Sequence, residues 1–190
     1  MNEAMRGFRE FRERFQPVLA ARPADPGVVE ALTTRIPPSL RDAWAELGWG
    51  GFGKGKLWLT DPAELEIALE LFLKQPTGAI AFARTGFGNV YYWREDGIKL
   101  IDVHYGKQYE VVSEIDDFIC RYLLSEEAFH EDMMGDLHDE AVGRLGPPAP
   151  EETFAFLPPL AMGGGEPSID LVQRVKWREH LAILAGVHFG

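Results

Sequence analysis

The side chains best suited to chemistry lie in the run HEDMMGDLHDE, from His130 to Glu140. A zinc protease of the HExxH type needs a histidine three residues after its glutamate, and Glu131 is followed by Asp-Met-Met instead. His130 and His138 are about two helical turns apart, which is too far for both to bind one metal ion directly. We therefore expect no metal and no cofactor here. A solvated acidic helix is the favoured interpretation, with a divalent-cation site as the alternative.

The glycine-rich stretch GWGGFGKGKLWL, residues 48–59, is the second candidate. A phosphate-binding loop needs G-x-x-x-x-G-K-[ST], with a strand before it and a helix after it. Here no Ser or Thr follows either lysine, and a predicted helix precedes the loop while a strand follows. A dinucleotide-binding fingerprint is excluded for the same reason, because it too requires a strand before the glycine-rich loop and a helix after it. The stretch is therefore predicted to be a tight helix-to-strand joint. In an alternative, exposed Trp49, Phe52 and Lys54 form a contact loop.

The remaining reactive residue types form no recognisable catalytic motif. The five histidines match no zinc or nucleophile pattern, and no G-x-S-x-G is present. His104 follows Asp102 by two positions on one strand face, which we interpret as a structural hydrogen bond. Cys120 is the single cysteine, so it cannot form an intrachain disulfide, and its apolar helical context indicates a core thiol. We expect no catalytic residues. The alternative is a small hydrolase or transferase using His104, or a metal-dependent enzyme using His130 and His138.

The charge balance restricts the kind of partner. The chain of 190 residues carries 30 acidic and 19 basic side chains, for a net charge of -11. Nucleic-acid binding requires a basic surface that displaces counterions, so we expect no nucleic-acid partner. An anionic membrane surface is disfavoured for the same reason. A basic protein partner is compatible, because complementary potentials speed association. No apolar run is as long as that of a signal peptide or a membrane helix, which indicates a cytoplasmic protein.

The elements that must position these residues suggest an α+β protein. Phenylalanines at spacings of three and four predict a helix over residues 4–20, and Pro37-Pro38 followed by Leu40 and Trp44 predicts another that ends at Gly48. Four β-rich runs separated by glycine turns predict an antiparallel meander: AIAFAR, NVYYWR, IKLIDVH and QYEVV. A short strand at Leu57–Leu59 precedes a helix capped by Asp61 or Thr60. We expect a compact sheet of about four to six strands packed by several α-helices.

The second half is predicted to be mostly helical. Ser113 with Asp116 suggests a capping box, and a second, more acidic helix is expected from about Ser125. The stretch ETFAFLPPLAMGGGEP is expected to be an ordered loop that could carry one short strand. The run SIDLVQRVKWREHLAILAGV is predicted to be a closing helix. Its expected core face consists of Ile169, Val172, Val175, Leu181 and Leu184.

Two segments resemble known families. The stretch IPPSLRDAWAELGWGGFGKGKLWLTDPAEL, with TGAIAFARTGFGNVYYW after it, resembles the GAD-like domain family. The tail from RLGPPAPEETFAFLPPL to HLAILAGV resembles the C-terminal domain of type VI secretion immunity proteins, and the helix-then-meander layout is similar to the SUKH superfamily. The resemblance implies three parts: an N-terminal helix at 1–25 outside the pattern, a GAD-like region at 26–103 and an immunity-protein C-terminal region at 104–190. The last two are expected to share one core.

The resemblance implies an immunity protein that binds a cognate secreted toxin, a DNase, and that catalyses nothing itself. A nuclease holds phosphates in a cationic groove, which an acidic inhibitor can cover. From the residues themselves we expect the contacts to come from an acidic run: Glu126, Glu127, Glu131, Asp132, Asp136, Asp139 and Glu140. Phe129, Met133 and Met134 would add apolar anchors, with a core role as the alternative. A general adaptor without a toxin partner is a further alternative, and the sequence leaves monomer or dimer open.

Overall fold

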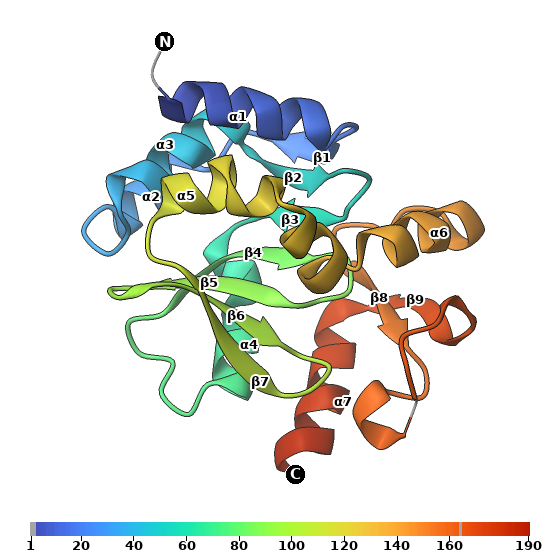
Figure 1. The fold of residues 1–190 in the computed structure, drawn as a ribbon. Helices are drawn as coiled ribbons and strands as arrows, with labels where there is room; N and C mark the ends of the chain where they lie inside the picture. The colour runs from blue at the N-terminus through green and yellow to red at the C-terminus, as the bar shows by residue number, and fades with distance from the viewer. Residues whose placement is uncertain (1–2, 164) are drawn as a thin grey trace.

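The computed structural model describes residues 3–163 and 165–190. Seven antiparallel strands form one sheet in chain order, so the predicted meander and α+β class are confirmed (Figure 1). The strands are β1 (Leu19–Arg22), β2 (Trp49–Phe52), β3 (Leu57–Leu59), β4 (Ile80–Thr85), β5 (Val90–Arg94), β6 (Gly97–Asp102) and β7 (Lys107–Val112). The four predicted β runs are β4 to β7. The sheet is wider than expected because β1 and β2 extend it beyond β3.

Strand β2 arises from the glycine-rich stretch, which is more than a joint. Gly48 ends the preceding helix with a positive φ of 70°, as predicted, but the next residues pair with β3 in a tight hairpin. Gly51 lies opposite Trp58 in this pair. A Cβ atom at Gly51 would lie 2.7 Å from Cζ2 of Trp58, so only glycine lets the indole lie across the neighbouring strand.

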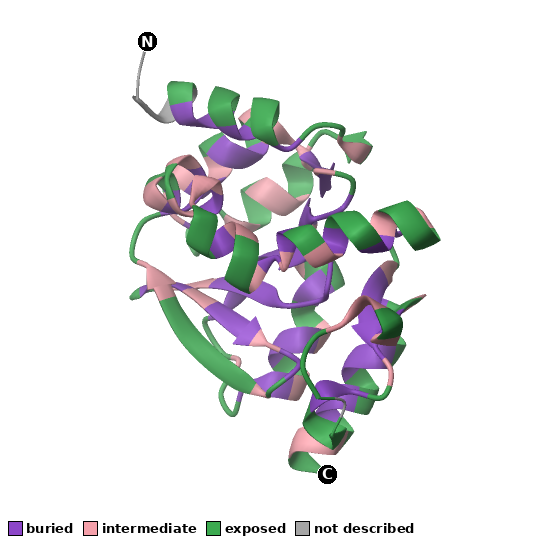
Figure 2. Cartoon of the chain, turned by 45° about the vertical axis from the view of Figure 1, so that its right-hand side comes forward, coloured by how far each residue is buried: buried purple, intermediate pink, exposed green. Residues whose placement is uncertain are grey.

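Helices cover both faces of the sheet, whose inner strands β2 to β6 are largely buried, whereas the edge strands β1 and β7 are mostly exposed (Figure 2). On β4, Phe82 faces the first cluster and Ala81 the second, as the alternation of a strand requires. The first face packs against α1 (Glu3–Arg14), α2 (Pro26–Leu32), α3 (Pro38–Leu47) and α5 (Ile115–Cys120). The second face packs against α4 (Pro62–Phe72) and α7 (Trp177–Phe189). The predicted faces of α1, α3 and α4 are the buried ones, and Asp61 caps α4. The helix predicted to reach residue 20 ends at Arg14 instead, and Leu19 begins β1, which pairs with β2.

The closing helix was predicted too long. Residues Ile169–Leu171 form a 3-10 turn, Val172–Lys176 form strand β9, and only then does α7 begin. Strand β9 pairs antiparallel with β8 (Glu152–Phe156) in a separate two-stranded sheet. Phe154 and Phe156 of β8 are buried with Phe87 in a third cluster. The distant β8 partner therefore decides the conformation of a segment whose local pattern also fits a helix.

The predicted acidic helix is also interrupted. Tyr122–Leu124 form a 3-10 turn, Ala128–Asp132 form a π-helical turn η2, and α6 (Gly135–Leu145) follows. Met134, between them, has a positive φ of 47°, which breaks the helical path. The expected capping box is absent as well, because Glu114 precedes α5 and makes no side-chain cap.

The two halves of the chain pack directly on each other. Helix α1 contacts α5, and α4 contacts α7. Phe118 of α5 lies in the same cluster as Phe82 of the sheet, at a ring distance of 5.5 Å. None of the helices in the described ranges is long and apolar enough to cross a membrane.

Candidate functional site

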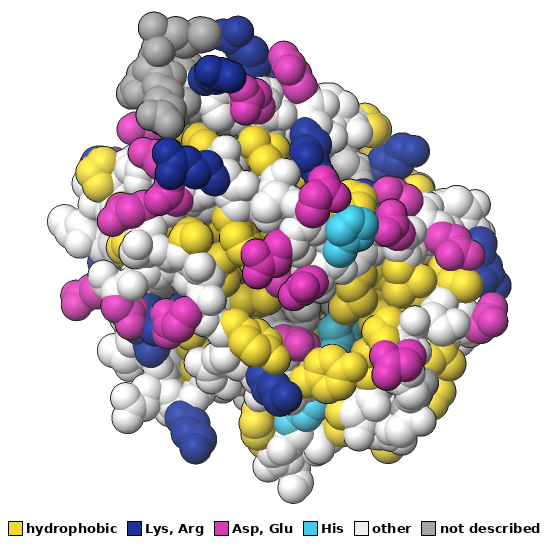
Figure 3. All heavy atoms as spheres, in the orientation of Figure 1, with side chains coloured by type: hydrophobic (Ala, Val, Ile, Leu, Met, Phe, Trp, Pro, Cys, Tyr) yellow, Lys and Arg dark blue, Asp and Glu magenta, His cyan; other side chains and the backbone are white. Residues whose placement is uncertain are grey.

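The segment from η2 through α6 presents an acidic face to solvent. Acidic side chains gather across the middle of the molecular face drawn in Figure 3. The side chains of Glu126 and Asp136 are 76% and 81% exposed, and that of Asp139 is 56% exposed. We use "acidic face" for six exposed residues: Glu126, Glu127, Glu131, Asp136, Asp139 and Glu140. These six belong to the set expected from the sequence.

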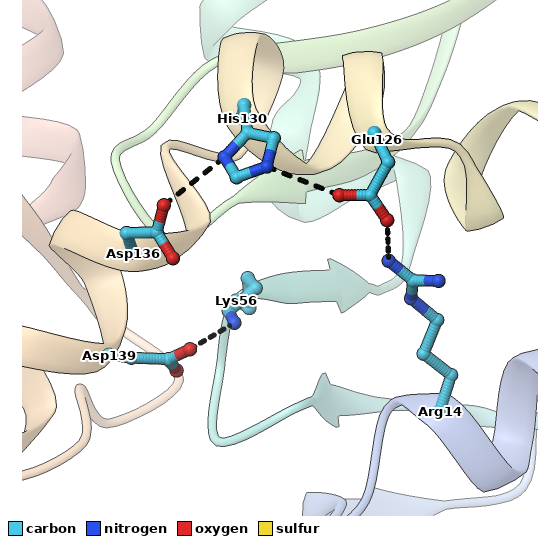
Figure 4. A network of polar contacts seen from close by, with 6 residues as sticks. All are labelled: Arg14, Lys56, Glu126, His130, Asp136 and Asp139. Atoms are coloured by element: carbon cyan, nitrogen blue, oxygen red, sulfur yellow. Dashed lines mark hydrogen bonds and ion pairs between the residues drawn. The ribbon is translucent and has the colours of Figure 1, made fainter.

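Ion pairs hold this face against the N-terminal half of the chain (Figure 4). Arg14, at the end of α1, lies 3.4 Å from Glu126. Lys56, in the β2–β3 turn, lies 2.8 Å from Asp139, and its Nζ is 4.3 Å from the ring centre of Phe129. The Lys56 side chain is only 8% exposed, so removing Asp139 would leave a buried charge without its carboxylate. The contacts fix the face in position, and the sequence pattern did not indicate them.

His130 lies between two carboxylates of the acidic face. Its Nε2 is 3.2 Å from Glu126 and its Nδ1 is 3.2 Å from Asp136, so one imidazole links η2 to the first turn of α6 (Figure 4). His138, in contrast, is fully buried on the inner side of α6. The two histidines therefore point to different environments. Within the described residues, no three His, Cys, Asp or Glu side chains converge as metal ligands would.

Two residues of the predicted contact set point into the protein. Asp132 accepts hydrogen bonds from the hydroxyls of Tyr91 at 2.7 Å and Tyr122 at 2.5 Å. Burial raises the pKa of the Asp132 carboxyl, and burial with the hydrogen bond to Asp132 raises the pKa of Tyr122. Met133 is fully buried in the first cluster. Both anchor η2 to the core, so neither offers a free contact to a partner.

The alternative of a contact loop with exposed Trp49 and Phe52 is wrong. Both side chains are 1% exposed. The indole of Trp49 packs edge-on against Trp44 at 5.8 Å, and Phe52 lies 5.2 Å from the ring of Phe11. Strand β2 carries these aromatic side chains into the first cluster, and only Lys54, at the tip of the turn, is exposed.

A hollow of about 390 Å³ adjoins the acidic face. Its lining combines carboxylates with apolar side chains: Asp102, Glu131 and Asp136 with Tyr105, Met134 and Leu137. Asp102 accepts backbone N–H groups of His104 at 3.0 Å and Tyr105 at 3.2 Å, and burial raises the pKa of its carboxyl. The predicted link between Asp102 and His104 thus goes through the main chain. A hollow of this composition suits a long cationic side chain, whose stem is apolar and whose head is charged.

The buried histidines are packed among aromatic rings. His104 lies 5.2 Å from Phe156, and burial lowers its pKa to about 3. His138 lies 5.3 Å from Phe154, and burial lowers its pKa to about 4. Both are neutral at physiological pH and enclosed by the third cluster, which gives them a packing role. Burial also raises the pKa of Cys120 to about 11, as expected for a thiol with core packing.

An antiparallel sheet with helices on both faces and an exposed acidic face defines the class: this is an α+β protein with an anionic surface on one side. The chain belongs to the GAD-like domain family, whose model matches residues 6–105. Residues 113–188 match the model of the C-terminal domain of the type VI secretion immunity protein Tdi1. Both resemblances inferred from the sequence are thereby confirmed. The first match includes most of α1, which the sequence motifs did not place in either family.

The comparison with solved structures supports the same fold. The crystal structure of Atu4351 from Agrobacterium tumefaciens is similar, with a TM-score of 0.69 and 16% sequence identity. The match covers 94% of this chain and 87% of that one. At this identity the likeness concerns the fold alone. No curated protein matches the chain significantly.

Proposed function

We propose that this protein is an immunity protein that neutralises a cognate type VI secretion toxin with DNase activity. It covers the active site or the DNA groove of the toxin with the acidic face. The observation that carries the proposal is the location of this face: six exposed carboxylates lie on η2, α6 and the residues before them, inside the segment that matches the Tdi1 immunity domain.

Electrostatics supports the choice of a DNase. A protein that cleaves DNA needs a cationic groove to hold the phosphates. A chain with a net charge of -11 is attracted to such a groove from a distance. A surface on which carboxylates are concentrated raises the association rate further. The proposed mode of action is therefore occlusion by binding, in the cytoplasm and without catalysis.

Preorganisation supports the choice of this surface. The pairs of Arg14 with Glu126 and Lys56 with Asp139 fix the acidic segment before any partner arrives. Ordering the segment in advance reduces the entropy lost on association. We further propose that the hollow beside Glu131 and Asp136 receives a lysine or arginine side chain of the toxin.

The test is a triple charge reversal on the acidic face. Glu127→Lys, Glu131→Lys and Glu140→Lys change exposed residues. The matched control reverses Glu30, Glu66 and Glu70, which are exposed on α2 and α4, so that the two variants have the same net charge. The affinity of each variant for the toxin encoded beside it is measured at several salt concentrations.

We expect the acidic-face variant to bind the toxin at least about tenfold more weakly, a loss of about 1.4 kcal/mol or more, mainly through slower association. Its salt dependence should fall, and cells co-expressing the toxin should lose protection. The control should retain most of its affinity. Equal affinity and equal salt dependence in the two variants would eliminate this face as the binding surface.

A further inference from the structure

A second cavity, of about 540 Å³, lies where the two halves of the chain meet. Strands β1 to β4 and helix α4 form one wall, and the residues before β8 with the β9–α7 joint form the other. Three tryptophans line it, Trp49, Trp58 and Trp177, and each is almost fully buried. The volume lies in the range of small-molecule sites, and none of the lining residues belongs to the acidic face.

A buried cation lines this cavity. Arg84 is 2% exposed, and its guanidinium carbon lies 5.0 Å from the ring centre of Trp58 and 5.3 Å from that of Trp177. Its hydrogen-bond acceptors among the described residues are main-chain carbonyls, at Pro150 (2.7 Å), Glu152 (3.1 Å) and Thr85 (3.5 Å). Burial lowers the pKa of Arg84 to about 9, with Glu64 partly offsetting the effect. The charge is thus enclosed without a directly bound carboxylate.

The rim adds positive potential from two further sources. Arg22, Lys176 and Arg178 lie around the cavity. Arg22 forms an ion pair with Glu64 at 2.8 Å, and Lys176 forms one with Glu151 at 2.9 Å. Helix α7 begins here, at Trp177, and its N-terminus has no side-chain cap. The N–H of Trp177 donates to the carbonyl of Glu151 at 3.0 Å. The N-terminus of a helix also carries partial positive charge, because its first N–H groups have no acceptor within the helix. The cavity lining contains four cationic side chains, Arg22, Arg84, Lys176 and Arg178, and three carboxylates, Glu64, Glu151 and Glu179. The formal charge of the lining is therefore +1, in a protein whose net charge is -11.

We propose that this cavity binds a small organic anion with a flat body. The carboxylate or phosphate of the ligand would face Arg84 and the N-terminus of α7, and the flat body would lie against the indoles. Such a ligand would contact both family segments at once, so it would stabilise the docking of α7 on the sheet. The site is independent of the proposed toxin surface.

The experiment measures binding to the full chain by calorimetry and by tryptophan fluorescence, since three indoles line the cavity. The probes are adenosine monophosphate and indole-3-acetate, each compared with its uncharged counterpart, adenosine or indole. Inorganic phosphate is the probe without a flat body. The variants are Lys176→Gln, Arg178→Gln and Arg84→Gln. Lys107→Gln makes the same charge change on β7, at the far edge of the sheet.

We expect at least one organic anion to bind and to change the fluorescence, with its uncharged counterpart weaker by roughly tenfold or more, as for a lost charged hydrogen bond. Lys176→Gln and Arg178→Gln should each weaken binding several-fold, and Lys107→Gln should not. The two rim variants decide the outcome if Arg84→Gln fails to fold. Absence of binding by both anions at millimolar concentration, or equal binding of charged and uncharged probes, would overturn the proposal. If inorganic phosphate bound as tightly as the organic anions, the proposal that the ligand has a flat body would be overturned.

Discussion

Acidification between pH 6.5 and pH 5 should destabilise this protein through its buried histidines. His104 and His138 are 1% and 0% exposed, and burial lowers their pKa values to about 3 and about 4 from an ordinary 6.5. Below pH 6.5 the unfolded chain takes up a proton at each site, whereas the folded protein does not. The unfolded state therefore binds more protons, and the free energy of unfolding falls as the pH falls.

The magnitude follows from the linkage relation. Each histidine loses about 1.4 kcal/mol of stability per pH unit below its unfolded pKa, so at pH 5 each has lost about 2 kcal/mol. Together they remove about 4 kcal/mol relative to pH 8, a large share of the 5–15 kcal/mol typical of domains. Burial lowers the pKa of His180 too, which acts in the same direction. The raised pKa values of Asp102 and Asp132 act oppositely, because the folded protein holds these two carboxyl protons to a higher pH than the unfolded chain does.

The assay is urea denaturation followed by tryptophan fluorescence at pH 8.0, 6.5, 5.5 and 5.0. His138→Asn removes one titrating group, so the loss of stability per pH unit should shrink by about 1.4 kcal/mol, whatever the variant's stability at pH 8. His130→Asn, at an exposed position on the acidic face, is the matched control and should keep most of the wild-type slope. A free energy of unfolding that stays flat from pH 6.5 to 5 would refute the burial of neutral histidines.

Two further predictions concern α1 and the residues packed on it. Gly7→Ala should destabilise the protein by about 1–3 kcal/mol, because its Cβ would lie 2.1 Å from Sγ of Cys120 where α1 meets α5. Gly143→Ala in α6 meets nothing within 4 Å and should stabilise by up to about 1 kcal/mol; equal thermal shifts in the two variants would contradict the close contact. The raised pKa of Cys120, about 11 against an ordinary 9.0, predicts alkylation on the order of 100-fold slower at pH 8 than in the urea-unfolded chain. Comparable rates in both states would show an ordinary thiol.

The elements that the sequence determined are those with a strong local signal. The phenylalanine spacing of α1, the prolines and Gly48 around α3, Asp61 before α4 and the turn-separated runs of β4 to β7 all predicted the observed elements. Each signal acts within a few residues, through side-chain periodicity, capping or the freedom of a glycine. The acidic run could be recognised as well, because charge density is visible in the sequence itself.

The tertiary structure alone decided which of these residues face solvent. Trp49 and Phe52 lie inside because β2 pairs with β3, and Val172–Lys176 form a strand because β8 is beside them. Asp132 turns inward because Tyr91, 41 positions earlier, donates a hydrogen bond to it. The pair of Lys56 with Asp139 joins positions 83 apart. Partners so distant in the chain leave no periodic trace in either segment, so burial and pairing at these positions follow from the assembled fold.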